Sequence, residues 1–246
     1  HAERFLYAKL PGAIRRFVTP MIIVLLGVPI VFLVIGPISD FVGGLLGDGI
    51  GWVFATVPVL GGAIMGGLWQ VFVIFGLHWA VIPLVAAQIA IDGSSPLNAI
   101  ISATMIAQGG GALAIWLKVK NPKIKTLAGP ATISAFCGIT EPAMYGLNLK
   151  YGRVFIMASI GGAVGGLLTG LFNVNMYGFT GAFVGFPSFV NPAGIDGGFT
   201  GFWIASLVAL AVSFGMTYFF GFKEEDFETG KEVKKVRLGK REPAGA

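Results

Sequence analysis

Of all residues in this sequence, Glu141 most clearly indicates a chemical function. It is the only acidic residue in the range 93–195, and it lies in an apolar stretch within the motif Gly138-Ile-Thr-Glu-Pro. A carboxylate at membrane depth costs about 2.5–3.5 kcal/mol on insertion scales, so it needs a partner or a function. The proline that follows breaks a helix, and the freed backbone groups are tolerated only inside protein or beside a water-filled cavity. Glu141, with Thr140 beside it, suits a hydroxyl-rich ligand; the alternative is a structural carboxylate that pairs with Lys150.

Three further residues are candidates for the same ligand. His78 lies deep in apolar sequence, and its ring can both donate and accept hydrogen bonds. Trp79 beside it can stack on the apolar face of a pyranose ring. Asn148 lies near a predicted helix end, where it either lines a cavity or caps the helix. For His78 the alternative is a structural histidine whose hydrogen bonds are satisfied within the protein.

Several other kinds of site are excluded by the sequence. It has no phosphate-binding glycine loop, no metal-ligand spacing and no visible nucleophile–base pair. Its single cysteine, Cys137, has no basic neighbour to make it a thiolate and is interpreted as a small apolar residue. The basic residues are dispersed between apolar stretches rather than gathered in a basic, aromatic-rich domain, which argues against nucleic-acid binding. We therefore predict neither a metal nor a cofactor.

The composition predicts a chain solvated by lipid. Apolar residues make up 55% and charged residues 12%, with 38 glycines among 246 residues, whereas a soluble domain has about 25% charged residues. No lysine or arginine occurs between Arg16 and Lys118. This apolar surplus exceeds what a soluble core can hold, and glycine is frequent where membrane helices pack closely. The predicted fold class is an all-α polytopic membrane protein.

Charge parity limits how the chain crosses the membrane. Basic clusters between apolar stretches indicate cytoplasmic loops, so Arg16, Lys118 and Lys150 should lie on one side. Residues 126–149 are too short for two spans of ~20 residues, and a single span would strand Lys150 outside. A re-entrant hairpin with Gly138 near its tip satisfies both constraints. Residues 52–91 either cross the membrane twice or enter and leave it on the same side. In the second case they form another re-entrant piece.

Three segments follow from these patterns. Residues 1–18 are predicted to be an amphipathic interfacial segment, and residues 19–222 a transmembrane domain that binds and transports the ligand. Within that domain, residues 173–198 are expected to be an irregular external or cavity-lining stretch. Residues 223–246 have mixed charge and nothing to bury, which is typical of a cytoplasmic linker tail.

Two motifs carry a resemblance to a known family. They are Gly76-Leu-His-Trp and Gly138-Ile-Thr-Glu-Pro-Ala-Met-Tyr-Gly. With them, residues 5–222 resemble the membrane (IIC) domain of phosphotransferase-system permeases of the glucose/glucoside superfamily. Trp79 after His78 looks most like the β-glucoside branch.

The resemblance implies a function and a set of partners. The chain would be the C-terminal, sugar-binding part of a IIC domain, with transmembrane helices and two re-entrant hairpins, in the bacterial inner membrane. It would carry a β-glucoside or related disaccharide by an elevator motion, with Glu141, His78, Trp79, Thr140 and Asn148 as substrate-binding candidates. Glu141 would orient the hydroxyl that is phosphorylated.

A phosphocysteine on a IIB domain, recharged by IIA, would supply the phosphoryl group, so no catalytic residue is expected in this chain. Basic loops and tail would be cytoplasmic, and preceding helices would form a homodimer.

Other functions remain open at this point. A trehalose- or sucrose-type permease would share the class and differ in substrate. An ion-coupled secondary transporter would use Glu141 as a proton or cation site. A non-transporting sugar receptor would bind sugar without flux.

Overall fold

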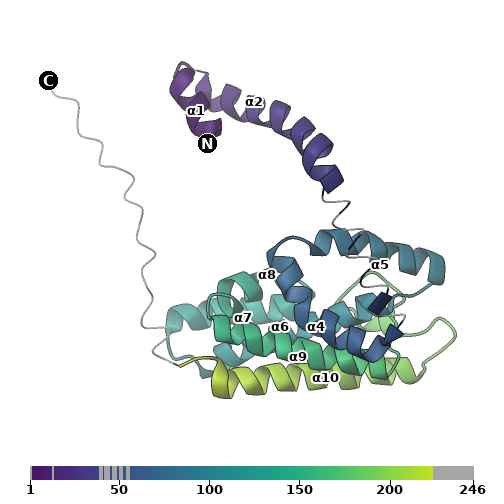
Figure 1. Cartoon of the computed structure of the whole chain (residues 1–246). Helices are drawn as coiled ribbons and strands as arrows, with labels where there is room; N and C mark the ends of the chain where they lie inside the picture. Colours follow the sequence, from purple (N-terminus) through teal and green to yellow (C-terminus); the bar gives the residue numbers. More distant parts are fainter. Residues whose placement is uncertain are drawn as a thin grey trace.

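The computed structural model is a helical bundle, from which the N-terminal helices extend (Figure 1). The structure describes residues 2–12, 14–38, 41, 45, 49, 52–53 and 56–223. In chain order the helical elements are α1 (Ala2–Lys9), α2 (Arg15–Ile30), η1 (Val31–Ile35), α4 (Pro58–Ile74), α5 (His78–Asp92), α6 (Pro96–Lys118), α7 (Pro122–Phe136), α8 (Glu141–Ala143), η2 (Met144–Asn148), α9 (Gly152–Leu171), η3 (Phe186–Phe189), α10 (Gly197–Met216) and η4 (Thr217–Gly221). Within these ranges only isolated β-bridges occur and no strand, which confirms the all-α prediction.

The helix lengths confirm a polytopic membrane protein. Four helical segments are long and apolar enough to span a bilayer: Arg15–Ile38, Pro96–Lys118, Gly152–Leu171 and Gly197–Gly221. The predicted boundary at residue 18 falls inside α2, which already begins at Arg15. The predicted linker tail lies, from residue 224 onward, outside the described residues.

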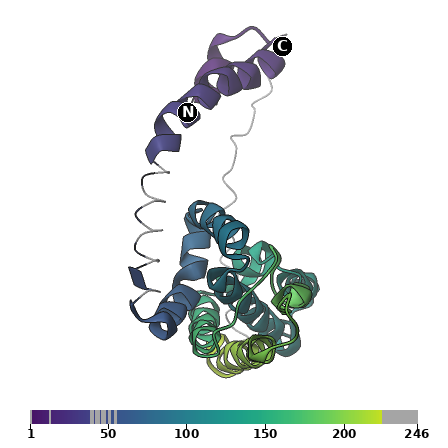
Figure 2. The same ribbon diagram turned by 90° about the vertical axis from the view of Figure 1, so that its right-hand side faces the viewer.

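Helix α6 is the centre of the bundle, and most of its residues are buried. It packs against α4, α7, α9 and α10 (Figure 2). Its start follows the predicted pattern, because the Ser95 side chain accepts a hydrogen bond from the Asn98 backbone N–H at 3.0 Å and Pro96 occupies the first helical position. Its C-terminal end is held by Lys118, whose Nζ donates to the Tyr218 carbonyl. Thus α6 and α10 end side by side, at the basic end of the bundle.

Four glycines let α4 and α9 touch backbone to backbone. A Cβ atom on Gly62 would lie 2.2 Å from the Gly166 carbonyl oxygen, and one on Gly66 would lie 2.2 Å from the Gly162 oxygen. The reverse additions on Gly162 and Gly166 meet α4 just as closely. Small residues four apart allow this approach, and the close packing and van der Waals contact stabilise helix pairs in membranes.

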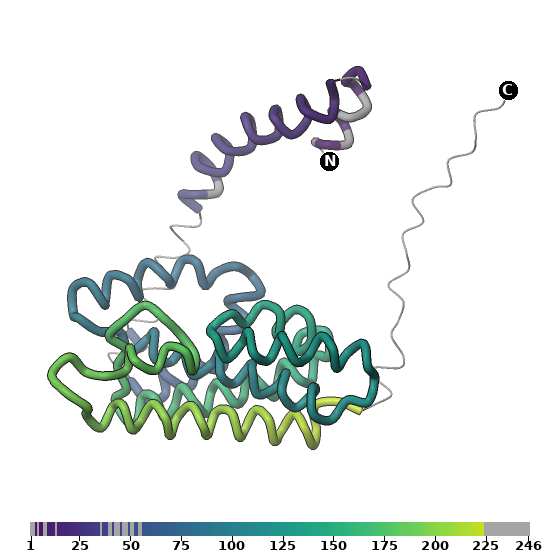
Figure 3. The backbone as a smooth tube through the Cα atoms, turned by 180° about the vertical axis from the view of Figure 1, so that it is seen from behind, coloured from purple at the N-terminus to yellow at the C-terminus, as the bar shows by residue number. Residues whose placement is uncertain are grey.

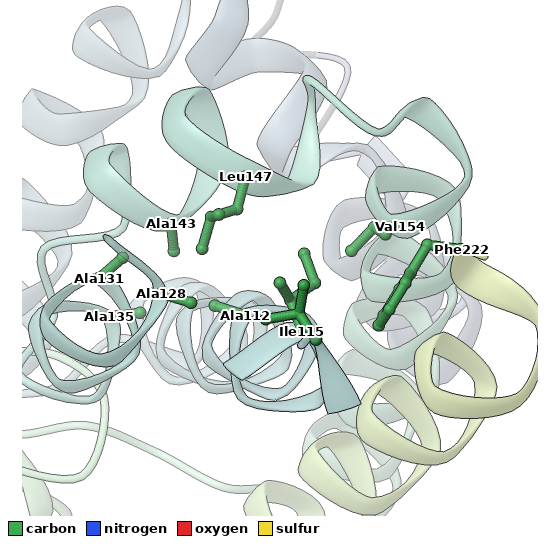
Figure 4. Packing of buried hydrophobic residues seen from close by; sticks show 10 residues of the cluster. Ala112, Ile115, Ala128, Ala131, Ala135, Ala143, Leu147, Val154 and Phe222 are labelled. Carbon is green, nitrogen blue, oxygen red and sulfur yellow. The ribbon is translucent and has the colours of Figure 1, made fainter. Parts of the chain in front are cut away.

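The predicted hairpin within residues 126–149 is present as a helical hairpin. Helix α7 leads into a turn at 137–140, and α8 with η2 then runs back along α7, so that Gly146 lies beside Leu127. Gly138 has φ +92°, a conformation that L side chains rarely adopt, and this makes the sharp turn possible. Alanines of α6, α7 and α8 with Leu147 and Phe222 form the core beneath the hairpin (Figure 4). Its re-entrant placement in a bilayer stays a prediction.

Residues 58–92 form the second interrupted segment. Helices α4 and α5, of 17 and 15 residues, are joined by a turn at 75–77. Helix α5 lies on the opposite side of the bundle from α10 (Figures 1 and 3). At 15 residues α5 is shorter than the ~20 residues of a spanning helix, which fits the no-net-crossing alternative better than two full spans.

The α4–α9 contact gives a prediction for stability. Gly66→Ala should lower the thermal midpoint of the full-length protein in detergent, because the new methyl group meets backbone rather than a flexible side chain, a cost of about 1–3 kcal/mol for overpacking. Gly215→Ala is the control, since that helical glycine has open space. Equal midpoints for the two variants would contradict the contact.

Candidate functional site

One cavity brings together residues that are distant in the sequence. It has a volume of about 380 Å³ and lies between α4, α5, α6, the 137–141 turn and the loop between α9 and α10. Its lining residues are Trp69, Val73, His78, Ile82, Asn98, Ile101, Met105, Cys137, Gly138, Thr140, Glu141, Phe179, Thr180, Gly181, Val184 and Gly185. The predicted irregular stretch 173–198 therefore does line a cavity.

Glu141 enters this cavity from the tip of the α7–α8 hairpin. It is the first residue of α8 and is exposed rather than buried, directly after the buried Thr140. Within the described part of the chain no ion pair joins it to Lys150, whose Nζ lies 5.6 Å from the Tyr151 ring centroid instead. The carboxylate is thus placed where its lone pairs can accept from a ligand.

His78 enters from the other hairpin, at the start of α5. Its Nδ1 is buried and has no hydrogen-bond partner within the described residues. Its ring stands edge-on to Trp69 at 6.3 Å and tilted to Trp79 at 5.4 Å between centroids. Buried polar atoms are nearly always hydrogen-bonded, so an unpartnered ring nitrogen beside a cavity is a position for a ligand hydroxyl group.

Of the remaining predicted site residues, one lines the cavity and two do not. Thr140 lines it. Trp79 is 71% exposed and lies outside the lining, where Trp69, only 3% exposed, provides the aromatic surface. Asn148 also lies outside: it is fully buried, and its Nδ2 donates to the Gln108 carbonyl at 3.0 Å and to Gln108 Oε1 at 2.7 Å. Asn148 therefore joins η2 to α6.

Asn98 is a cavity residue that sequence reasoning missed. Its Nδ2 lies 3.0 Å from Met176 Sδ, 3.2 Å from the Gly178 carbonyl and 3.3 Å from the Thr180 carbonyl. It thereby fixes the loop segment that forms one cavity wall to the first turn of α6. No local pattern of the sequence marks Asn98, because its contacts with Gly178 and Thr180 join segments 80 and 82 residues apart.

The same loop is also fastened to the hairpin tip. The Phe183 backbone N–H donates to the Phe136 carbonyl at 3.1 Å. A Cβ atom on Gly138 would lie 3.3 Å from the Gly181 carbonyl oxygen, so tip and loop are in close contact. The wall that faces Glu141 is consequently held from two sides.

Fold and cavity together define a multi-spanning membrane protein with a cavity between two interrupted helical hairpins. Residues 2–162 match the family described as "Phosphotransferase system, EIIC". The chain belongs to that family.

Curated relatives agree with the family assignment. The chain is 47% identical over 199 residues to the "PTS system beta-glucoside-specific EIIBCA component" of Halalkalibacterium halodurans, covering 80% of this chain and 31% of the relative. It is 36% identical over 230 residues to the protein of that name from Dickeya chrysanthemi, covering 91% and 35%. A "PTS system sucrose-specific EIIBC component" of Vibrio alginolyticus is 32% identical over 216 residues, covering 86% and 44%. The chain thus spans less than half the length of these relatives. The comparison with solved structures finds no significant match.

The role of Asn98 can be separated from general packing. If the full-length protein phosphorylates a sugar bound in this cavity, Asn98→Ala should raise the KM for that sugar roughly three- to tenfold, with kcat little changed, because the wall loses one or two hydrogen bonds. Asn148→Ala is the matched control, since it removes an equally buried amide outside the cavity. It should lower the thermal midpoint without moving KM. A KM shift of the same size in both variants would contradict a positioning role.

Proposed function

We propose that this chain is the sugar-binding part of a β-glucoside permease of the phosphotransferase system. The observation that supports it best is the cavity in which His78, with its unpartnered Nδ1, and Glu141 meet from two hairpins. The printed names of the two β-glucoside-specific relatives point to the substrate class. The bound sugar would be neutral, which fits a lining whose described residues include one carboxylate and neither lysine nor arginine.

The residues of the cavity suit distinct parts of a glycoside. Glu141 and Thr140 offer acceptors to sugar hydroxyl groups, and His78 Nδ1 offers either an acceptor or a donor depending on its tautomer. Trp69 and Phe179 provide aromatic surface for the apolar face of the ring. Ligand sites of this kind combine a mostly apolar wall with a few convergent polar groups.

Phosphoryl transfer requires a partner in this proposal. The IIB domain named in the relatives would bring a phosphocysteine to the sugar. The hydroxyl oxygen held by Glu141 would attack the phosphorus atom, the cysteine sulfur would leave, and the hydroxyl proton would be released. The role of Glu141 is to orient that hydroxyl, and an elevator motion of the cavity would deliver it to the cytoplasmic side.

The orientation follows the basic residues. Lys118 at the end of α6 lies beside Tyr218 near the end of α10, and both helices end at the basic end of the bundle. By the positive-inside tendency this end would face the cytoplasm, where IIB and IIA operate. The loop between α9 and α10 would then face outward.

A sucrose permease is the second candidate. Several relatives are named sucrose-specific EIIBC components, at 32–39% identity. Their similarity supports the same class of transporter with a different disaccharide.

The test is phosphorylation by the full-length protein in membranes with phosphoenolpyruvate and the general phosphotransferase proteins. Salicin should be phosphorylated in preference to sucrose and trehalose. Glu141→Gln should lower kcat/KM at least tenfold, because hydrogen bonds to a charged group contribute about 1.5–3 kcal/mol. Asp92→Asn, an equally conservative change at an exposed residue outside the cavity, should have no effect.

The other outcomes discriminate the alternatives. Phosphorylation of sucrose with salicin untouched would support the sucrose permease. Uptake driven by a proton gradient with no phosphorylated product would overturn the proposal in favour of an ion-coupled transporter.

A further inference from the structure

A second cavity, of about 320 Å³, lies at the end of the bundle away from Lys118. It forms where α9 ends and α10 begins. Three carboxamide side chains line it, together with one carboxylate and two aromatic rings: Asn173, Asn175, Asn191, Asp196, Phe172 and Tyr177. Its wall is thus far more polar than that of the first cavity.

Hydrogen bonds hold this wall in place without a ligand. Asn191 Nδ2 donates to Asp196 Oδ2 at 2.9 Å, and Asn191 Oδ1 accepts from the Ala193 backbone N–H at 2.9 Å. Asp196 Oδ1 in turn accepts from the Phe199 N–H at 3.2 Å and caps α10. Asn191 and Asp196 therefore act as the fixed frame of the cavity, and a preorganised frame lowers the cost of binding.

The other side chains are available for contact. Asn175 uses its Nδ2 to bind the Asn173 carbonyl at 3.1 Å, which leaves its Oδ1 as an acceptor. Asn173 has φ +49°, in the left-handed region that asparagine tolerates, where the chain leaves α9. Desolvation and the nearby Asp196 raise the pKa of Tyr177, and a hydrogen bond with the Asn191 side chain opposes them. A tyrosine phenol is protonated at neutral pH in any case, so Tyr177 can act as a donor.

The chemistry of this wall favours a saccharide. Carboxamides both donate and accept, as sugar hydroxyl groups require, and Phe172 and Tyr177 offer aromatic surface. A divalent cation fits less well, because both oxygens of the one carboxylate in the lining already accept hydrogen bonds, from Asn191 and from the Phe199 N–H. We infer that this cavity is a second, peripheral saccharide-binding subsite, an inference that rests on the proposed sugar-handling function.

One loop connects the two cavities. Its middle, with Phe179, Thr180 and Gly181, lines the first cavity, while its two arms line the second. The arms are joined across the loop, since the Tyr177 N–H donates to the Ser188 carbonyl at 2.6 Å. The first arm is also held to the start of α6, where Met176 pairs with Ser95. A sugar held in the peripheral subsite therefore lies against the loop that walls the inner site, and would raise the local sugar concentration there.

The experiment reads both cavities in one sample. The full-length Asn175→Cys protein, in membrane fragments open on both faces, is treated with a maleimide with and without salicin. Modification of each cysteine is followed by mass spectrometry of its own peptide. Native Cys137, which is exposed and lines the inner cavity, reports on the proposed sugar site. Ile195→Cys, in the same loop but outside both linings and 75% exposed, is the control for the loop.

Salicin should slow modification at Cys137 and at Asn175→Cys, but not at Ile195→Cys. Adding Glu141→Gln should abolish protection at Cys137 and leave it at Asn175→Cys. Asn191→Ala should raise the half-protecting salicin concentration at Asn175→Cys roughly three- to tenfold, as expected when the frame loses the two hydrogen bonds of the Asn191 side chain.

The two proposals fail differently. Protection at Cys137 with none at Asn175→Cys overturns the peripheral subsite and leaves the proposed function standing. Protection at Asn175→Cys that disappears with Glu141→Gln also overturns it, because closure around the inner site then explains the effect. If salicin does not protect Cys137, that result by itself contradicts the proposed function.

Discussion

The backbone contact between α4 and α9 is the constraint on which the inner cavity depends. Gly62 and Gly66 on one helix meet Gly166 and Gly162 on the other with no room for a side chain. This close approach fixes α4 against the bundle, and α4 carries Trp69 and leads directly into the turn before His78. In lipid, where burial of apolar surface gives no advantage between helices, such packing is what sets helix positions.

The opposite wall is positioned by a different device. The α7–α8 hairpin turns at Gly138 and packs its alanines on α6, which brings Glu141 to the cavity. The loop after α9 then closes the space, tied by Asn98 on α6 and by the Phe136 carbonyl on α7. Irregular backbone is tolerated at membrane depth only where it faces protein or a cavity, and both interruptions here do so.

Charge spacing in the sequence was enough to predict the hairpin in residues 126–149. Local composition predicted its tip near Gly138 and the irregular stretch 173–198. Which side chains of the bundle line the cavity depends on how the helices are rotated against one another. Trp79 was predicted to stack on the ligand, but it lies outside the cavity lining, and Trp69 on α4 lies within it. Only the packing of the two helices around the turn at 75–77 decides which ring lines the cavity. Asn98 and the pairing of Asn148 with Gln108 were not predictable, since they join segments 78 and 40 residues apart.

In the proposed function, two hairpins distant in sequence present their residues to one sugar. Cross-linking of native Cys137 to an introduced Ile82→Cys by a short bis-maleimide in membranes, detected by mass spectrometry of the linked peptides, tests this arrangement. Both positions line the inner cavity, so an efficient link that salicin blocks is expected. Ile91→Cys, exposed near the far end of α5, should not link. A link at Ile91→Cys instead of Ile82→Cys, or one unaffected by salicin, would contradict a shared sugar site.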